Sequence, residues 1–252
     1  MKDHDGCCSF DETHDGTRRT LFKSVAGMAA IGLLGGLTLA SPFPALAAAM
    51  TKDDRDKLTP DQIIDAFKQG NERFRSGKMH PHDYLAQKRA SASGQYPAAV
   101  ILSCIDSRAP AEIILDAGIG DTFNARVAGN VVNDDVLGSL EFACALSGAK
   151  LVVVMGHSAC GAIKGAIDDA ELGNLTGLLD KIKPAVKVTQ YAGERSSKNA
   201  AFVDEVAKSN VRLAIDEIRK RSDVLEKMEK DGKIKIVGAM YQLVGGRVEF
   251  FS

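Results

Sequence analysis

Apolar residues are distributed along the chain in short continuous runs, separated by longer stretches of helical spacing. Residues 98–103 and 150–155 are almost entirely aliphatic, which is typical of strands buried on both faces of a sheet. A third strand is predicted at 122–127, and residues 233–243 and 247–251 predict a C-terminal hairpin around two glycines. The chain therefore combines several strands of the parallel type with one antiparallel pair.

The stretches between these runs have the three- to four-residue apolar spacing of helices. Thr59, Pro60 and Gln62 form a helix start, and this helix is predicted to end at Gly77. A second well-marked helix is capped by Asn133. Other helices are expected at 110–115, from near residue 160, at 175–191 and at 199–221. This order predicts an α/β fold: a mostly parallel central sheet flanked by helices, with an N-terminal helical arm and a C-terminal hairpin that adds an antiparallel edge strand.

Two polar segments near the N-terminal helix have no clear element. The charged run 52–57 is interpreted as a solvated linker, and residues 78–96 are left without an assignment. The second segment contains His80 and His82. We interpret this pair as part of a surface loop, because no thiol or carboxylate cluster accompanies it as a metal site would require.

The first 47 residues have the pattern of an export signal. Arg18 and Arg19 precede an apolar stretch at 25–40 that is short for a membrane span and interrupted by glycines. The small residues Ala45 and Ala47 then form a peptidase recognition pattern. This leader resembles a twin-arginine (Tat) signal peptide cleaved near Ala47, which implies a periplasmic or secreted protein. The alternative is an uncleaved membrane anchor, which the small residues at the cleavage pattern disfavour.

Composition and charge exclude several classes of partner. The 252 residues are 45% hydrophobic and 26% charged, as in an ordinary soluble globular protein. The formal net charge of −1 gives no indication of a nucleic-acid partner or of a stable membrane partner. Five cysteines are too few for a disulfide scaffold. They fit metal ligation or buried thiols better.

Reactive side chains follow two of the predicted strands. Cys104, Asp106 and Arg108 come directly after strand 98–103, and His157 and Cys160 come after strand 150–155. Because parallel strands end at one edge of a sheet, we expect the two groups to meet there. Two thiolates and an imidazole suit zinc, and three protein ligands leave one position open, as in catalytic zinc sites.

In such a site zinc acidifies a bound water, and Asp106 could accept a hydrogen bond from it. Arg108 could pair with Asp106 through two hydrogen bonds and keep it ionised. The competing interpretation is that these cysteines are ordinary core residues. That interpretation suits Cys144, which lies on an amphipathic predicted helix without polar company.

Segments 103–108 (Ser-Cys-Ile-Asp-Ser-Arg) and 156–161 (Gly-His-Ser-Ala-Cys-Gly) resemble the two signature segments of the β-class carbonic anhydrases. The resemblance implies a zinc lyase that interconverts CO2 and bicarbonate, with one Zn2+ per subunit. It implies Cys104, His157 and Cys160 as zinc ligands, with Asp106 and Arg108 as the catalytic pair beside the metal. In some members the aspartate becomes a fourth ligand and closes the site, so Asp106 could do the same here.

The same resemblance implies a substrate pocket and an oligomer. The implied pocket positions are Gln95, Phe123, Gly129, Asn130 and Phe142. Of these, Gln95 would reach the site of a neighbouring subunit. Phe142 replaces a tyrosine of plant-type members. Ile101 replaces a tryptophan of members with a non-catalytic bicarbonate site, which disfavours that site here. The implied assembly is a homodimer or a tetramer, with a partner covering the apolar positions of the N-terminal helix.

The expected organisation is thus a signal peptide at 1–47, a linker and dimerisation helix at 48–97, and a zinc-binding α/β carbonic anhydrase domain at 98–252. Two further functions are compatible with the residues. The same scaffold could hydrolyse CS2 or COS, which are linear like CO2. Alternatively, the chain could be a non-catalytic zinc- or bicarbonate-binding protein with Asp106 on the metal, although such a site has no need of Arg108.

Overall fold

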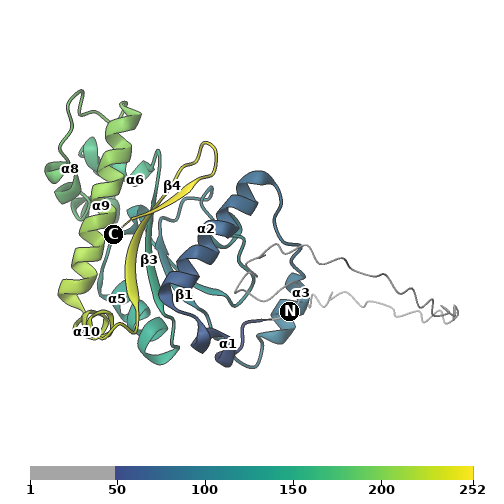
Figure 1. Cartoon of the computed structure of the whole chain (residues 1–252). Helices are drawn as coiled ribbons and strands as arrows, with labels where there is room; N and C mark the ends of the chain where they lie inside the picture. The colour runs from purple at the N-terminus through teal and green to yellow at the C-terminus, as the bar shows by residue number, and fades with distance from the viewer. Residues whose placement is uncertain (1–48, 252) are drawn as a thin grey trace, which may run out of the picture. The chain divides into compact units, whose positions relative to one another are not determined.

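The computed structural model describes residues 49–251, so the predicted leader and its cleavage site lie outside the described residues. A five-stranded sheet in the order β2-β1-β3-β4-β5 forms the centre (Figure 1). Its strands are β1 (Ala99–Ser103), β2 (Thr122–Arg126), β3 (Leu151–His157), β4 (Lys235–Tyr241) and β5 (Val248–Phe251). The first four are parallel and β5 runs antiparallel to β4, which confirms the predicted fold class.

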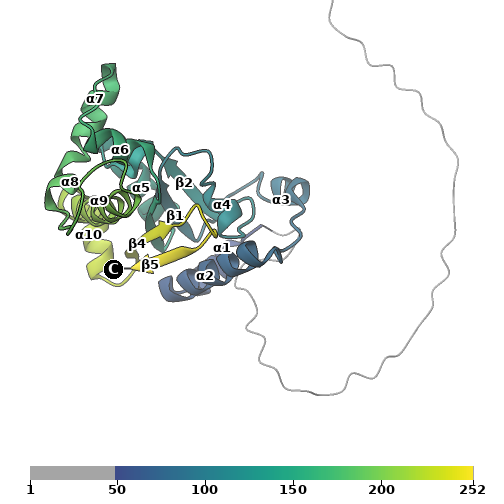
Figure 2. The same cartoon turned by 90° about the horizontal axis from the view of Figure 1, so that it is seen from above.

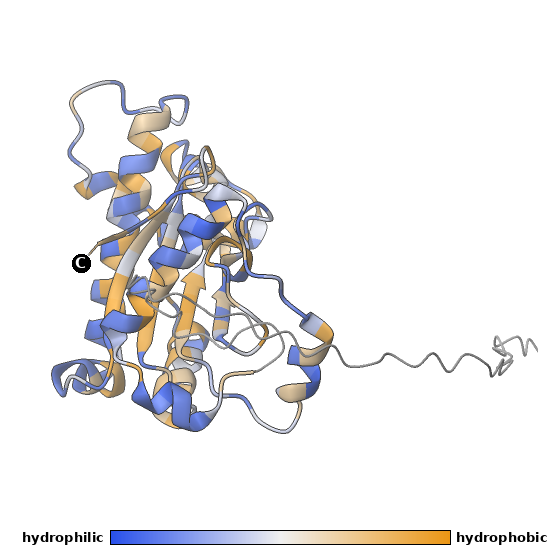
Figure 3. Ribbon diagram, turned by 45° about the vertical axis from the view of Figure 1, so that its right-hand side comes forward, coloured by the Kyte–Doolittle hydropathy of each residue, from blue (hydrophilic) through white to orange (hydrophobic). Residues whose placement is uncertain are grey.

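Side chains of the central strands alternate between two apolar layers. Val100, Leu102, Val152 and Val154 enter one cluster, while the residues between them enter the other. The first layer is closed by α5 (Asp134–Glu141), α6 (Gly161–Ile167), α8 (Lys183–Val188), α9 (Ala200–Arg221) and α10 (Asp223–Lys230). The second is closed by α2 (Pro60–Ser76) and α4 (Ala111–Ile114) (Figure 2). Since both faces are covered, the central strands β1 and β3 are buried along their whole length and almost entirely apolar (Figure 3).

The N-terminal helix α2 starts with the predicted capping box, in which Thr59 and Gln62 exchange hydrogen bonds. Its apolar face is, however, already buried within the same chain. Ile63 and Phe67 are both 0% exposed and pack against the chain's own sheet. The expectation that a partner subunit covers these positions was therefore wrong, because the outer face of the sheet already buries them.

Several local assignments also need correction. The charged run forms a short helix, α1 (Lys52–Lys57), because Thr51 caps it and Lys52 pairs with Asp56 one turn later. Its Arg55 is buried and donates to the backbone carbonyl of Ser147. The remaining elements are α3 (Tyr84–Ala90), α7 (Gly173–Asp180), a single 3-10 turn Ala128–Asn130 and a π-helical turn Phe142–Leu146. Within the described part of the chain, no helix is long and apolar enough to cross a membrane.

His82 lies in the loop before α3, as predicted, but its side chain turns inward and is buried. Its ring is 8% exposed and lies 3.0 Å from Oδ1 of the fully buried Asp116. Asp116 also accepts hydrogen bonds from the Arg73 side chain and from the backbone N–H of His80. Hydrogen bonds from these neighbours outweigh the burial of Asp116 and hold its pKa below the ordinary value. This buried network fastens the segment before α3 to the rest of the chain.

A buried carboxyl at the start of β2 makes stability depend on pH. Burial raises the pKa of Asp121 to about 6, although the Gly118 N–H donates to it. The unfolded chain releases this proton at a lower pH, so the folded state holds it more tightly. We expect the stabilising contribution to be complete below about pH 4 and lost as pH rises through 6, at a cost of roughly 2–3 kcal/mol.

Asp121→Asn should therefore raise the free energy of unfolding at pH 8 and leave it nearly unchanged at pH 4. Urea unfolding at the two pH values measures this difference. The exposed Asp61→Asn serves as the matched control. Equal effects of Asp121→Asn at both pH values would contradict the assignment.

Candidate metal centre

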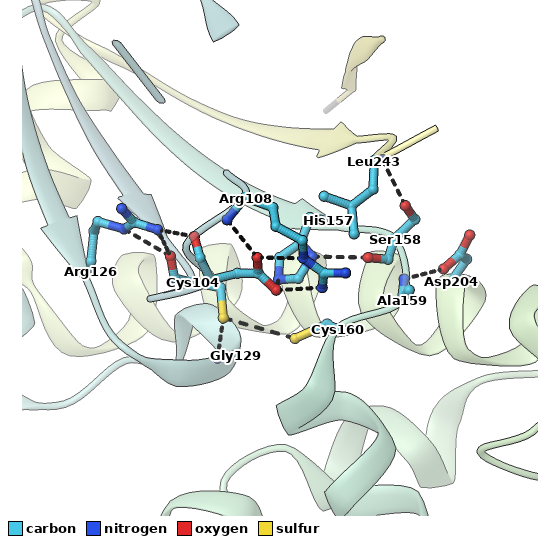
Figure 4. Close-up of polar contacts among 11 residues, drawn as sticks. Cys104, Arg108, Arg126, Gly129, His157, Ser158, Ala159, Cys160, Asp204 and Leu243 are labelled. Carbon is cyan, nitrogen blue, oxygen red and sulfur yellow. Dashed lines mark hydrogen bonds and ion pairs between the residues drawn. The ribbon is translucent and has the colours of Figure 1, made fainter. Parts of the chain in front are cut away.

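The two reactive segments meet at the carboxyl edge of the sheet, as the sequence predicts. β1 and β3 are parallel neighbours, and Ser103 lies beside Met155 in their register. Cys104 follows the last residue of β1, while His157 ends β3 and Cys160 directly precedes α6 as its N-cap. The chain direction of two adjacent strands thus brings all three side chains to one place (Figure 4).

The three donor atoms form a compact buried cluster. Cys104, His157 and Cys160 are 5%, 2% and 2% exposed, and their ligand atoms all lie within 4.8 Å of one another. The two Sγ atoms are 3.9 Å apart. Two thiolates on a tetrahedral zinc would be separated by about 3.8 Å, given Zn–S bonds of ~2.3 Å. The spacing of the sulfurs therefore fits zinc.

The imidazole is prepared in the form that binds a metal. Nδ1–H of His157 donates to the backbone carbonyl of Ser158 at 2.9 Å, which leaves Nε2 as the bare nitrogen. Nε2 is buried and has no hydrogen-bond partner among the described residues. An unsatisfied buried nitrogen is costly in an apolar interior, and a cation between it and the two sulfurs would satisfy it.

The two thiols are each other's hydrogen-bond partners and differ in acidity. The contact with Cys160 lowers the pKa of Cys104 below its ordinary value. The same contact, together with burial, raises the pKa of Cys160. A divalent cation would have to displace the remaining proton, since metal ligands are thiolates.

A tight turn after β2 supports Cys104. The N–H of Gly129 donates to Sγ of Cys104 at 3.3 Å, and Asn210 of α9 holds the Gly129 carbonyl at 2.8 Å. Gly129 has a left-handed φ of 65°, and a Cβ there would meet Cδ1 of Ile182 at 2.5 Å. Only glycine fits both the backbone conformation and the space. The predicted position Asn130 is next to it, 3% exposed, with Nδ2 unpaired among the described residues.

Asp106 and Arg108 form the predicted bidentate pair. Nε and Nη2 of Arg108 donate to the two carboxylate oxygens at 2.9 and 2.7 Å, and the Arg108 backbone N–H donates to Oδ1 at 2.9 Å. These bonds hold the pKa of Asp106 well below its usual range. Oδ2 of Asp106 lies 3.8 Å from Nε2 of His157. The ionised carboxylate of Asp106 thus lies beside the donor cluster and is held in place by Arg108.

Arg126 is a supporting residue that the sequence reasoning missed. Ending β2, it donates to the backbone carbonyl of Cys104 through Nε and Nη2 at 2.9 and 2.7 Å, and to that of Asp106 at 2.5 Å. It therefore fixes the segment that carries both a donor and the carboxylate. A signal existed, because an arginine at the end of a predicted neighbouring strand points to the same sheet edge.

The remaining predicted pocket residues lie elsewhere in a single chain. Cys104 and Asp106 line an apolar cavity of about 290 Å³ with Ile105, Ala128, Gly161, Ala162, Gly165, Leu175 and Leu179. The rings of Phe123 and Phe142 pack edge to face, with their centroids 6.1 Å apart. They line a separate cavity of about 610 Å³. Gln95 lines a third surface cavity beside Gly120 and Thr122. The structure of one chain does not bring Gln95, Phe123 or Phe142 to the donor cluster.

Cys144 lies outside the centre. It lies on the π-helical turn Phe142–Leu146 with 1% exposure and packs in the core, and burial raises its pKa to about 12. The prediction that this cysteine is a core residue is confirmed.

Comparison with known proteins identifies the class. A family model described as carbonic anhydrase matches residues 99–248. The chain is 38% identical over 188 residues to Carbonic anhydrase 2 of Mycobacterium tuberculosis, covering 72% of this chain and 88% of that protein. It is 35% identical over 193 residues to a carbonic anhydrase of Mycolicibacterium smegmatis, covering 74% and 91%. The chain therefore belongs to the carbonic anhydrase family.

Solved structures narrow the class by fold. A chain from the two tetrameric β-carbonic anhydrases of Sordaria macrospora matches with a TM-score of 0.57 at 25% identity, over 64% of this chain and 83% of that chain. The β-carbonic anhydrase CcaA matches with a TM-score of 0.60 at 20% identity, over 75% and 88%. The fold is that of the β class.

Proposed function

We propose that this chain binds one Zn2+ through Cys104, His157 and Cys160 and catalyses the reversible hydration of CO2 to bicarbonate and a proton. The family membership and the fold make it an enzyme of the carbonic anhydrase type. The observation that carries the proposed mechanism is the bare, buried Nε2 of His157 between two thiols, directly beside the Asp106–Arg108 pair.

Each residue of the centre has a distinct task in this reaction. When bound, zinc supplies a Lewis acid that lowers the pKa of water in the site toward neutrality. Asp106 stays ionised because Arg108 donates to both of its oxygens, so it can accept a hydrogen bond from the attacking water and orient it. The apolar lining from Ile105, Leu175 and Leu179 suits a small neutral molecule such as CO2.

The test is CO2 hydration by stopped flow on purified protein whose zinc content has been measured. We expect turnover at alkaline pH in proportion to bound zinc. Zinc-loaded protein that does not hydrate CO2 would rule the proposal out. The same cavity would accept CS2 or COS, so both should be assayed in parallel. Turnover of those substrates without CO2 hydration would favour the hydrolase.

A non-catalytic zinc protein would need Asp106 on the metal. Both oxygens of Asp106 are instead held by Arg108 in this structure, which supports an open site. A zinc-bound structure at two pH values would compare the two positions of the carboxylate directly. The proposal expects Asp106 on Arg108 at the pH where CO2 is turned over.

We further propose that the chain works as a homodimer or a tetramer built on the β2 edge of the sheet. β2 pairs only with β1 among the described strands, so its outer edge has unpaired backbone groups. Apolar side chains flank it, with Phe142 49%, Ile113 47% and Ile119 42% exposed. A second copy on this edge would cover them and could bring its Gln95 and Phe123 toward a neighbouring centre.

Phe142→Glu should therefore weaken self-association by at least about 100-fold, as for a central aromatic contact of an interface. Sedimentation velocity over a concentration series measures the change. Val188→Glu on α8, 57% exposed, is the matched control and should associate like the unaltered protein. An unchanged assembly in Phe142→Glu would place the interface elsewhere.

We also propose export by the Tat route, with cleavage near Ala47. The support is the sequence pattern of Arg18, Arg19 and the small residues before Ala47. Fractionation of cells that express the chain, with N-terminal sequencing of the exported form, tests it. Arg18→Lys with Arg19→Lys should retain the protein in the cytoplasm, and normal export of that variant would contradict the proposed route.

A further inference from the structure

The turn between the two donors of the second segment is strained. Ala159 lies between His157 and Cys160 and has a φ of 53°. This left-handed conformation suits glycine and disfavours a residue with a Cβ. Such a conformation persists only where neighbouring groups hold it in place. The relative position of the two donors therefore depends on what fixes this turn.

A carboxylate of α9 holds the strained residue. The backbone N–H of Ala159 donates to Oδ1 of Asp204 at 3.0 Å. Figure 4 shows Asp204 beside Ala159, on the side away from Arg108, so it is distinct from the carboxylate that pairs with Arg108. Asp204 is only partly buried and comes from an element that contributes no donor atom.

The other end of the turn is fixed by the sheet. The Ser158 N–H donates to the carbonyl of Tyr241, and the Ser158 hydroxyl accepts from the Leu243 N–H, both at 2.9 Å. These bonds fix the residue next to His157. Asp204 fixes Ala159, the residue next to Cys160. Each end of the turn is therefore held by a different contact.

We propose that Asp204 is a positioning residue of the metal centre, which holds the Ala159 turn so that Nε2 of His157 and Sγ of Cys160 face one cation. This inference rests on the proposed zinc site. Asp204 does not touch the donors or the substrate cavity and acts through the backbone of Ala159. Its loss should therefore change metal affinity and ligand geometry more than it changes the stability of the metal-free chain.

The experiment measures zinc affinity of the purified protein by competition with a chromophoric chelator. Asp204→Leu removes the acceptor at similar size and should weaken zinc binding about 10- to 100-fold, as for other groups that orient metal ligands. Asp204→Asn keeps an acceptor oxygen and should bind within about threefold of the unaltered protein. Asp216→Leu, an exposed aspartate on the same helix, is the matched control for lost charge.

Two readouts separate positioning from general stability. The cobalt-substituted protein should show altered visible absorption bands in Asp204→Leu and unaltered bands in Asp204→Asn. Ala159→Gly removes the strain that Asp204 offsets, so in that background Asp204→Leu should cost at most about threefold in zinc affinity. This double variant also gives a result if Asp204→Leu alone does not fold.

Unaltered zinc affinity and cobalt spectrum in Asp204→Leu would overturn the inference. An equal loss with and without Ala159→Gly would also overturn it, because the turn would then not be the route of the effect. Failure of the unaltered protein to bind zinc at all is a separate result, and it would refute the proposed function instead.

Discussion

Replacing Cys160 with alanine is expected to remove zinc from the protein and lower CO2 hydration by at least about a thousandfold. The reason is that a bound zinc ion lowers the pKa of water from about 15.7 to about 7, and this effect is lost with the metal. Cys160 is one of three buried donors, and its sulfur lies 3.9 Å from that of Cys104. The remaining imidazole and single thiol cannot hold the metal against competition from solvent. Metal analysis by mass spectrometry and stopped-flow hydration measure the two losses.

Cys144→Ala provides the matched control, because it removes a thiol that is equally buried but lies away from the centre. This variant should keep full zinc and full turnover, with a modest loss of stability from the small cavity. If Cys160→Ala retained stoichiometric zinc, the cluster would not be the metal site. If both variants lost zinc alike, the effect would belong to folding.

Arg108→Ala is expected to leave zinc bound while lowering kcat roughly 100-fold, the lower end of what a positioned acid or base contributes. Asp106 then loses both side-chain hydrogen bonds that fix its orientation. Its pKa should rise from its depressed value toward the ordinary 3.8, so the carboxylate remains ionised at neutral pH. The loss therefore comes from orientation, and the acid limb of any pH profile should move to higher pH.

Arg108→Lys separates charge from geometry. Lysine keeps the positive charge but not the planar fork, so it should recover the low pKa of Asp106 better than it recovers kcat. Measurements of kcat against pH, with zinc content at each pH, distinguish the two effects. A structural site would respond differently: both variants would change thermal stability alone and leave the rate per bound zinc unaltered.

Much of the fold could be predicted because its signals are local. Aliphatic runs marked β1 and β3, and the cap residues Thr59 and Asn133 marked the helices they begin. Helix α1 was missed because its residues are charged, and its stability depends on the cap at Thr51 and on side-chain pairs one turn apart. Helix α10 was missed because it follows α9 directly, with Ser222 ending one helix and capping the next.

In the candidate site too, local sequence patterns predicted some residues, while the roles of others depend on distant contacts. Cys104 and His157 could be placed together because each follows an aliphatic strand and parallel strands end at one edge. Asp204 could not be assigned, since its role depends on a contact with a backbone atom 45 residues away. For Arg126 the end of a predicted strand indicated the sheet edge, but nothing in the sequence indicated its contact with the Cys104 carbonyl 22 residues away. Gln95 and Phe142 are not near the donors in one chain, so no pattern within a single sequence could show how they would reach a site.

The contacts of α9 with much earlier parts of the chain also determine when zinc can bind during synthesis. Its Asp204 and Asn210 hold groups that lie 45 and 81 residues earlier in the chain, on both sides of the donor cluster. A nascent chain that ends before α9 already contains every donor but lacks these two supports. Tight zinc uptake should therefore come after the chain has folded onto α9, and zinc would complete the enzyme without nucleating its folding.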